Sequence, residues 1–235
     1  MGMIDPKSKL QWFQFSLRTL LVVVTLCAIL LGWLAIKTQQ AKQEREREAD
    51  RAVETATENL GGHVSRASSS RIYSVSLDGT NVTDAGLEYL KGSSQLADLR
   101  LEHTKITDAG LEHLKGLTQL RELRLGYTKV TDAGLENLKG TTQLRELRLC
   151  YTKVTDLKNL KGLSELRELD LDGTRVTDAG LKDIKGFRWL IALRLNGTQV
   201  TDAGLKNLNG LEMLAVLHLD GTQVTDVGLE HLSEQ

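Results

Sequence analysis

Cys150 is the side chain in this sequence that comes closest to a catalytic nucleophile. A thiol enzyme needs a histidine within hydrogen-bond reach of the sulfur. In the repeating pattern described below, His103 is expected two strands away from Cys150, about 10 Å at the usual strand spacing. His113 and His231 occupy equivalent positions in different copies of the repeat, and no cysteine and histidine spacing matches a zinc site. The sequence therefore predicts a protein that is not an enzyme, with no metal site and no cofactor.

Two other features suggest chemistry, and each has a simpler explanation. Cys27 follows Leu26, whereas a lipidation signal needs a small residue before the cysteine. Lys139-Gly140 could belong to a phosphate-binding loop, but the pair recurs along the chain, and a cation followed by glycine is typical of a helix C-terminus. The whole chain has 30 basic and 31 acidic residues, a net charge of −1, which argues against a nucleic-acid-binding protein.

An uncharged segment, residues 19–36, is long enough to cross a bilayer. As a helix rising about 1.5 Å per residue, it spans about 27 Å. Trp12 and Trp33 stand near its ends, where aromatic rings commonly sit among lipid headgroups. A cleavable signal peptide is the rival interpretation, but residues 35–37 do not provide the small-x-small cleavage site. We therefore predict a retained single-pass anchor that follows a short N-terminal tail, residues 1–18.

Residues 37–60 predict a helical stalk, because they include no proline or glycine and are rich in Gln, Glu, Arg and Ala. A thin apolar seam could pair with another helix or lie on the first repeat. The seam consists of Ala49, Val53, Ala56 and Leu60. Glycines at 61 and 62 end the helix, and residues 61–71 are predicted to form a linker and the N-terminal edge of the repeat domain.

Residues 72–235 consist of seven copies of one sequence unit. The copies are spaced by 24, 24, 24, 22, 24 and 24 residues, and this period indicates a solenoid. The repeats, numbered 1 to 7, begin at Ile72, Leu96, Leu120, Leu144, Leu166, Leu190 and Leu214. In repeat 3, LRELRLGYTKVTDAGLENLKGTTQ, alternating leucines predict a strand, and Thr131-Asp132 can cap a helical turn that Lys139-Gly140 ends. Each copy exposes leucines that only its neighbours can cover.

The unit L-x-x-L-x-L-x-x-T-x-V-T-D-A-G-L resembles the leucine-rich repeat, with Thr where the family usually has Asn or Cys. The resemblance implies an α/β solenoid, a right-handed horseshoe with a parallel sheet on its concave side. One threonine recurs in all seven repeats, and its buried hydroxyl is expected to bond backbone in the adjacent turn, so that the copies form a ladder; its members are Thr80, Thr104, Thr128, Thr152, Thr174, Thr198 and Thr222. Repeat 4 reads TDLKNLKG from Thr155 and lacks the Ala-Gly pair, so we expect a shorter convex segment there.

The residues beside the strand leucines define the concave surface in columns. The first two columns are Ser74, Asp98, Glu122, Glu146, Glu168, Ala192 and Val216, then Ser76, Arg100, Arg124, Arg148, Asp170, Arg194 and His218. The next two are Asp78, Glu102, Gly126, Cys150, Asp172, Asn196 and Asp220, then Gly79, His103, Tyr127, Tyr151, Gly173, Gly197 and Gly221. Nine carboxylates against four arginines predict an acidic surface and a basic or mixed polar partner. We expect the acidic and arginine columns to neutralise one another sideways.

One cluster on this surface departs most from the repeating pattern. Tyr127 and Tyr151 are neighbours, His103 and Cys150 flank them, and arginines precede them. Aromatic and arginine side chains supply much of the binding energy of protein interfaces. The predicted partner-binding patch is therefore His103, Arg124, Tyr127, Arg148, Cys150 and Tyr151.

The anchor sequence FSLRTLL at Phe15–Leu21, followed by T-x-V-T-D-A-G-L repeats, is similar to bacterial membrane-anchored leucine-rich-repeat proteins. This resemblance implies protein interaction at the cell envelope with the repeats outside the cytoplasm, whereas the count of Lys and Arg around the span favours the cytoplasm. The repeats also resemble those of F-box adaptors, but no F-box precedes them. The predicted function is a non-enzymatic, membrane-anchored module that binds a protein or peptide and no nucleic acid. The alternative is a structural envelope protein that associates with itself through its uncapped last repeat or its stalk.

Overall fold

The computed structural model describes residues 17–66 and 71–233, and the predicted N-terminal tail with Trp12 lies almost entirely outside them. The chain forms two compact units, Met1–Arg47 and Glu48–Gln235. Helix α1, Leu17–Asn59, begins in the first unit and ends in the second. Each unit is described by itself below.

The described part of the first unit is a helix that is apolar from Leu20 to Ile36 and largely polar from Lys37 to Arg47. Its side chains are exposed from Leu20 to Ile36, with Leu30 at 64% and Trp33 at 57% exposure. Among the described residues, this is the helix that is long and apolar enough to cross a membrane, a property that a signal sequence would share. A helix that is apolar on every side and contacts no protein needs a nonpolar environment or a partner to cover it.

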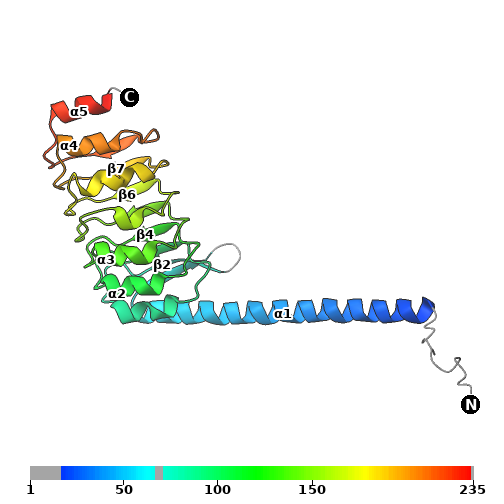
Figure 1. The fold of residues 1–235 in the computed structure, drawn as a ribbon. Coiled ribbons are helices and arrows are strands. Elements are labelled where there is room, and N and C mark those ends of the chain that lie inside the picture. The colour runs from blue at the N-terminus through cyan, green and yellow to red at the C-terminus, as the bar shows by residue number, and fades with distance from the viewer. Residues whose placement is uncertain (1–16, 67–70, 234–235) are drawn as a thin grey trace, which may run out of the picture. The chain divides into compact units, whose positions relative to one another are not determined.

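The second unit is a solenoid built on one sheet, and its described residues contain eight strands in the order β1 to β8. Strands β2 to β8 are parallel, and their stacked order can be followed from cyan to red in Figure 1. The strands are β1 (His63–Arg66), β2 (Ile72–Ser76), β3 (Asp98–Arg100), β4 (Glu122–Arg124), β5 (Glu146–Arg148), β6 (Glu168–Asp170), β7 (Ala192–Arg194) and β8 (Val216–His218). The solenoid predicted from the repeats is confirmed.

Short helices form the opposite side of each repeat. They are η1 (Asp84–Leu90), α2 (Asp108–Leu111), η2 (Glu112–Leu114), α3 (Asp132–Leu135), η3 (Glu136–Leu138), η4 (Lys158–Leu160), η5 (Gly180–Gly186), α4 (Asp202–Leu205), η6 (Lys206–Leu208) and α5 (Asp226–Ser233). In repeat 4, η4 is a single 3-10 turn without the preceding α-helical turn. The shorter convex segment predicted for this repeat is therefore present.

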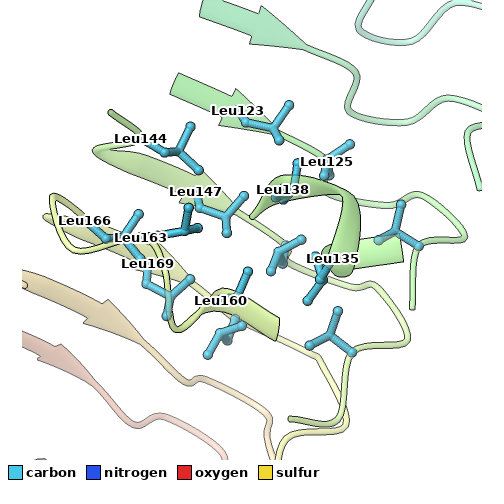
Figure 2. Close-up of a cluster of buried hydrophobic side chains, with 14 of the residues drawn as sticks. Leu123, Leu125, Leu135, Leu138, Leu144, Leu147, Leu160, Leu163, Leu166 and Leu169 are labelled. Carbon is cyan, nitrogen blue, oxygen red and sulfur yellow. The ribbon is translucent and has the colours of Figure 1, made fainter. Parts of the chain in front are cut away.

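Leucines from successive repeats form one continuous core. The side chains of Leu123, Leu147 and Leu160 are completely buried, and Figure 2 shows them among the leucines of the repeats on either side. Because each repeat covers its neighbours' leucines, stability comes from contacts between repeats and not from any repeat alone.

In repeats 2, 3 and 6, the Thr-Asp pair makes hydrogen bonds both within its own repeat and with the next repeat. Thr131 caps helix α3, and its hydroxyl accepts a hydrogen bond from the Ala133 N–H at 3.3 Å, as predicted. Asp132 is not a cap as we expected. Its carboxylate accepts hydrogen bonds from the backbone N–H and the hydroxyl of Thr155 in the next repeat. The same Asp-to-Thr connection recurs from Asp84 to Thr107, Asp108 to Thr131, Asp178 to Thr201 and Asp202 to Thr225.

This connection explains the glycine of the DAGL motif. A Cβ on Gly204 would lie 2.2 Å from Asp178 Oδ1, and a Cβ on Gly134 would lie 2.4 Å from Asp108 Oδ1. Only glycine leaves room for the carboxylate of the preceding repeat. The ladder threonines act differently from our expectation, because each hydroxyl bonds a carbonyl of its own repeat, as Thr128 Oγ1 donates to Leu125 O at 2.7 Å.

The end of α1 covers the first repeat. Val53 is 3% exposed and Thr57 is fully buried, with its hydroxyl 3.1 Å from the Tyr89 hydroxyl. The predicted seam is shifted by one residue at its start: Ala49 is exposed, whereas Asp50 is buried and pairs with Arg71 at 2.6 Å. The helix therefore serves as the N-terminal cover of the solenoid.

Strand β1 is a second element of this cover, and it lies inside residues 61–71, which we predicted as a linker and the N-terminal edge of the repeat domain. It pairs with β2 in antiparallel register, with Val64 opposite Val75. Val64 packs partly against the core, which gives this short polar segment an apolar reason to join the sheet.

Candidate functional site

His103, Tyr127 and Tyr151 form a stack of rings at the end of strands β3 to β5. The ring centroids lie 4.1 Å apart for His103 and Tyr127 and 4.5 Å apart for Tyr127 and Tyr151, with nearly parallel planes. Tyr127 is 46% and Tyr151 is 55% exposed. The Tyr151 ring covers Gly173, where an added Cβ would come within 2.6 Å of ring carbons.

The backbone of this column is left-handed in every repeat. The φ angle is +56°, +58° and +55° at His103, Tyr127 and Tyr151, and it lies between +63° and +69° at the four glycines of the same column. Glycine adopts this conformation freely, whereas a bulky side chain there costs about 1–3 kcal/mol. Three successive repeats therefore keep an aromatic side chain where the backbone favours glycine.

We expect Tyr151→Gly to be more stable than Tyr151→Ala by about 1 kcal/mol, because alanine keeps the left-handed strain and glycine removes it. Both variants lose the same ring contact with Tyr127, so the comparison isolates the backbone. Urea denaturation of the two detergent-solubilised full-length variants measures the difference. A more stable alanine variant would show that the backbone at this position is not left-handed.

Cys150 lies beside the stack, but its thiol lacks the low pKa of a nucleophilic cysteine. Burial, followed by the nearby carboxylates of Asp170 and Glu102, raises the pKa of its thiol to about 12. Its Sγ packs against Gly126, where an added Cβ would lie 2.6 Å away. A protonated thiol is a poor nucleophile. Burial therefore keeps the Cys150 thiol protonated near neutral pH, which does not suit a nucleophile.

In a Cys27→Ser background, iodoacetamide should alkylate Cys150 of the folded protein more than about tenfold slower at pH 8 than it does in urea. The raised pKa leaves little thiolate in the fold, whereas the unfolded thiol titrates near 8.5. Mass spectrometry against time gives both rates. Equal rates would contradict the proposed environment of the thiol.

Arg124 and Arg148 are direct neighbours in the sheet, and both are held by carboxylates. Arg148 Nε lies 2.7 Å from Glu146 Oε1, and Arg124 reaches the same Glu146 oxygen at 3.4 Å. Burial, followed by the carboxylates of Asp98 and Glu146, raises the pKa of Glu122. The predicted sideways neutralisation of the acidic and arginine columns is present in these strands.

Most carboxylates of the predicted acidic surface are engaged in similar bonds. Asp98 pairs with Arg100 at 2.9 Å and accepts a hydrogen bond from the Ser74 hydroxyl. Asp78 accepts the Glu102 N–H and Asp172 accepts the Asn196 N–H, each at 2.7 Å. The ion pairs with Arg100, Arg124 and Arg148 neutralise part of this surface, whereas Asp78 and Asp172 keep their negative charge.

The sequence analysis missed two further surfaces, which lie around the first leucine of successive repeats. Arginines line a groove at repeats 3 to 5, and large apolar side chains are exposed at repeats 6 and 7. An alignment of the repeats could have revealed both surfaces, because the positions beside the first leucine are polar in repeats 3 to 5 and apolar in repeats 6 and 7. The described residues contain no group of His, Cys, Asp and Glu that could hold a metal ion.

Comparison with known proteins supports the fold. The leucine-rich-repeat family pattern matches residues 116–139 and 164–185. The chain is similar to an internalin (inlF) of Listeria monocytogenes, with 27% identity and a TM-score of 0.60 over 69% of this chain and 46% of the internalin. It therefore spans less than half of that protein. No curated protein matches the chain.

Two further solved structures share the fold at lower identity. Internalin C2 of Listeria monocytogenes is 24% identical with a TM-score of 0.50, over 76% of this chain and 87% of the internalin. A chain of the PEPR1-AtPEP1 structure is 17% identical with a TM-score of 0.50, over 68% of this chain and 23% of that chain. The stacked strands, the buried leucines and these similarities identify the chain as a leucine-rich-repeat protein.

Proposed function

We propose that this protein is a non-enzymatic, membrane-anchored module that binds a protein or peptide on the concave face of its solenoid. The stack of His103, Tyr127 and Tyr151 is the observation that carries the proposal. Its rings are exposed, and each is held at a left-handed backbone position where four other repeats have glycine. Strained residues of this kind concentrate at functional sites, and exposed tyrosines are common anchors of protein interfaces.

The stack lies in one patch with Arg124, Arg148 and Cys150. Arg124 and Arg148 occupy the strands that lead to Tyr127 and Tyr151 and are held in place by Glu146. The patch is rigid because it is built on adjacent strands, so little conformational entropy is lost when a partner binds.

The test compares full-length parent with a Tyr127→Gly plus Tyr151→Gly variant. Both are captured by an affinity tag from the same membranes, and the associated proteins are quantified by mass spectrometry. We expect at least one associated protein to fall about tenfold or more in the variant, since anchor residues dominate binding energy. Lys115→Ala plus Lys139→Ala, on the convex side, is the matched control. An unchanged set of proteins would remove the patch from the proposal.

Anchoring and location form a separate part of the proposal. The apolar segment of α1 is fully exposed over its span, and we infer that it stays in the membrane with the repeats on the extracytoplasmic side. Protease added after the outer barrier alone is breached should digest the repeats. Digestion that requires permeabilisation of the inner membrane would place them in the cytoplasm.

Self-association through the last repeat is the second candidate. Helix α5 exposes Val227 at 61% and Leu229 at 44%, and two copies could cover these side chains. Analytical ultracentrifugation of the full chain in detergent should then show an assembly that Val227→Ser plus Leu229→Ser disrupts. A monomer at all concentrations would exclude this candidate.

A further inference from the structure

Three positions of each repeat, the residue before its first leucine and the two residues after that leucine, change from polar to apolar along the solenoid. In repeats 3 to 5 they are polar or charged: Gln119, Arg121, Glu122, Gln143, Arg145, Glu146, Glu165, Arg167 and Glu168. In repeats 6 and 7 the same positions are all apolar: Trp189, Ile191, Ala192, Met213, Ala215 and Val216. The repeat fold itself does not require this change, because the buried leucines are the same in both regions.

The apolar residues form an exposed patch, called here the apolar patch and consisting of Trp189, Ile191, Met213 and Val216. Their exposures are 53%, 36%, 47% and 43%. Clustered exposed side chains of this size mark an interaction site, and tryptophan and methionine are enriched at protein interfaces.

The arginines form a groove next to the apolar patch. Arg121, Arg145 and Arg167 line this open groove together with Tyr73 and neighbouring glutamates. The three arginines are exposed, and the structure shows no ion pair for them among the described residues. Glu146, in contrast, is engaged by Arg124 and Arg148. The groove therefore presents cationic groups that a partner could use.

One row of backbone hydrogen bonds joins the groove to the patch. Arg167 N donates to Arg145 O at 2.8 Å, Ile191 N to Arg167 O at 2.7 Å, and Ala215 N to Ile191 O at 2.9 Å. The arginines and Ile191 therefore stand side by side, each immediately before one of the adjacent strands β4 to β7. At the usual strand spacing, Arg145 and Ile191 are about 10 Å apart, which about three extended residues of a peptide would span.

We propose that the arginine groove and the apolar patch form one docking site for an extended segment of a partner protein. The segment has acidic residues over Arg121 and Arg145 and, about three residues away, a large apolar residue on Trp189, Ile191 and Met213. Charge complementarity with the arginines favours the acidic end of the segment. Burial of apolar surface on the apolar patch favours the apolar end. The inference rests on the proposed function and specifies its partner, and it replaces the basic or mixed polar partner expected from the count of carboxylates.

A selection from a random dodecapeptide library displayed on phage tests the proposal, with the full-length protein in detergent as bait. We expect enriched peptides to carry two or more Asp or Glu residues with Trp, Phe, Leu or Ile three or four positions away. Enrichment of neutral or basic peptides, or no enrichment, would overturn the proposal.

Variants then locate the binding of one enriched peptide, synthesised with a fluorescent label. Arg121→Glu plus Arg145→Glu and, separately, Trp189→Ser plus Met213→Ser should each weaken binding about tenfold or more in fluorescence anisotropy. The matched control changes convex side chains, Lys115→Glu plus Lys185→Glu, and should leave the affinity unchanged. Circular dichroism confirms that all variants are folded.

Other occupants give different results in the same assays. If the peptide ignores both pairs of variants, the docking site is wrong. Binding of phosphatidylglycerol vesicles in place of peptides, or a Trp189-dependent change in assembly size, would replace the partner with a membrane or a second copy and overturn the proposal. Tyr127→Gly plus Tyr151→Gly distinguishes the ring stack of the proposed function from the docking site. If this variant loses partner capture but still binds the peptide, and the docking-site variants keep partner capture, the partner binds at the ring stack and the docking site is not its binding site.

Discussion

Leu147→Ala is expected to lower the free energy of unfolding by about 3 kcal/mol. The Leu147 side chain is completely buried in β5, at the centre of the solenoid, and it lies between Leu123 and Leu169 of the neighbouring strands. Truncation of a buried leucine loses its transfer free energy and leaves a cavity, which together cost about 2–5 kcal/mol. Urea denaturation of the detergent-solubilised full chain, followed by circular dichroism, gives the change.

Leu217→Ala is the matched control for this prediction. Leu217 occupies the same column in the last strand, but it is only partly buried because one side of it has no covering repeat in this chain. We expect it to cost less than Leu147→Ala by at least about 1 kcal/mol. Equal costs at the two positions would contradict the view that stability comes from contacts on both sides of each repeat.

Asp178→Ala is expected to cost about 2–4 kcal/mol. The Asp178 carboxylate accepts hydrogen bonds from the Thr201 N–H at 2.8 Å and from the Thr201 hydroxyl at 2.7 Å, and both link adjacent repeats. Hydrogen bonds to a charged group contribute about 1.5–3 kcal/mol each, and their removal leaves an N–H without its partner. The same denaturation measurement applies.

Asp156 provides a control with the same sequence motif. In the short repeat 4, its carboxylate bonds the nearby Lys158 N–H at 3.1 Å, and the structure shows no bond from it to Thr177 of the next repeat. We expect Asp156→Ala to cost less than about 1 kcal/mol. If Asp156→Ala costs as much as Asp178→Ala, the connection between repeats is not what makes the Thr-Asp pair important.

The fold could be predicted from the sequence because the same pattern of apolar residues occurs in all seven repeats. Alternating leucines such as Leu123 and Leu125 require a strand with one buried face, and the period of the unit places these leucines next to one another. The columns of the concave surface follow from the same register, which pairs Glu122 with Glu146 and Arg124 with Arg148.

The elements that occur only once were harder to predict. Strand β1 has no repeating pattern, and its place in the sheet depends on contact between Val64 and the core. Asp50 lies in the polar stalk sequence, and its partner Arg71, which is distant in sequence, pairs with it only in the folded structure. The role of Asp132 was assigned to its own helix because its hydrogen-bond donor in the next repeat, Thr155, could not be seen from one repeat alone.

The candidate site was predicted only in part. The neighbouring tyrosines were visible in the sequence, and the glycines in their column hinted at the left-handed backbone that the structure shows. The negative charge that the concave surface offers to a partner could not be obtained by counting carboxylates. It depends on which carboxylates form ion pairs within the protein, as Glu146 does with Arg148. The apolar patch was missed because Trp189 and Met213 stand outside the columns beside the strand leucines.

We expect a partner to bind the concave side of the solenoid. Photo-crosslinking in cells that express the full chain tests this expectation. A benzophenone amino acid replaces Tyr151 on the concave side or Trp189 in the apolar patch and, in matched variants, Lys115 or Lys182 on the convex side. The account predicts discrete crosslinked species from Tyr151 and Trp189 and none from the two lysine positions. Crosslinks only from the convex positions, or none from either side, would contradict it.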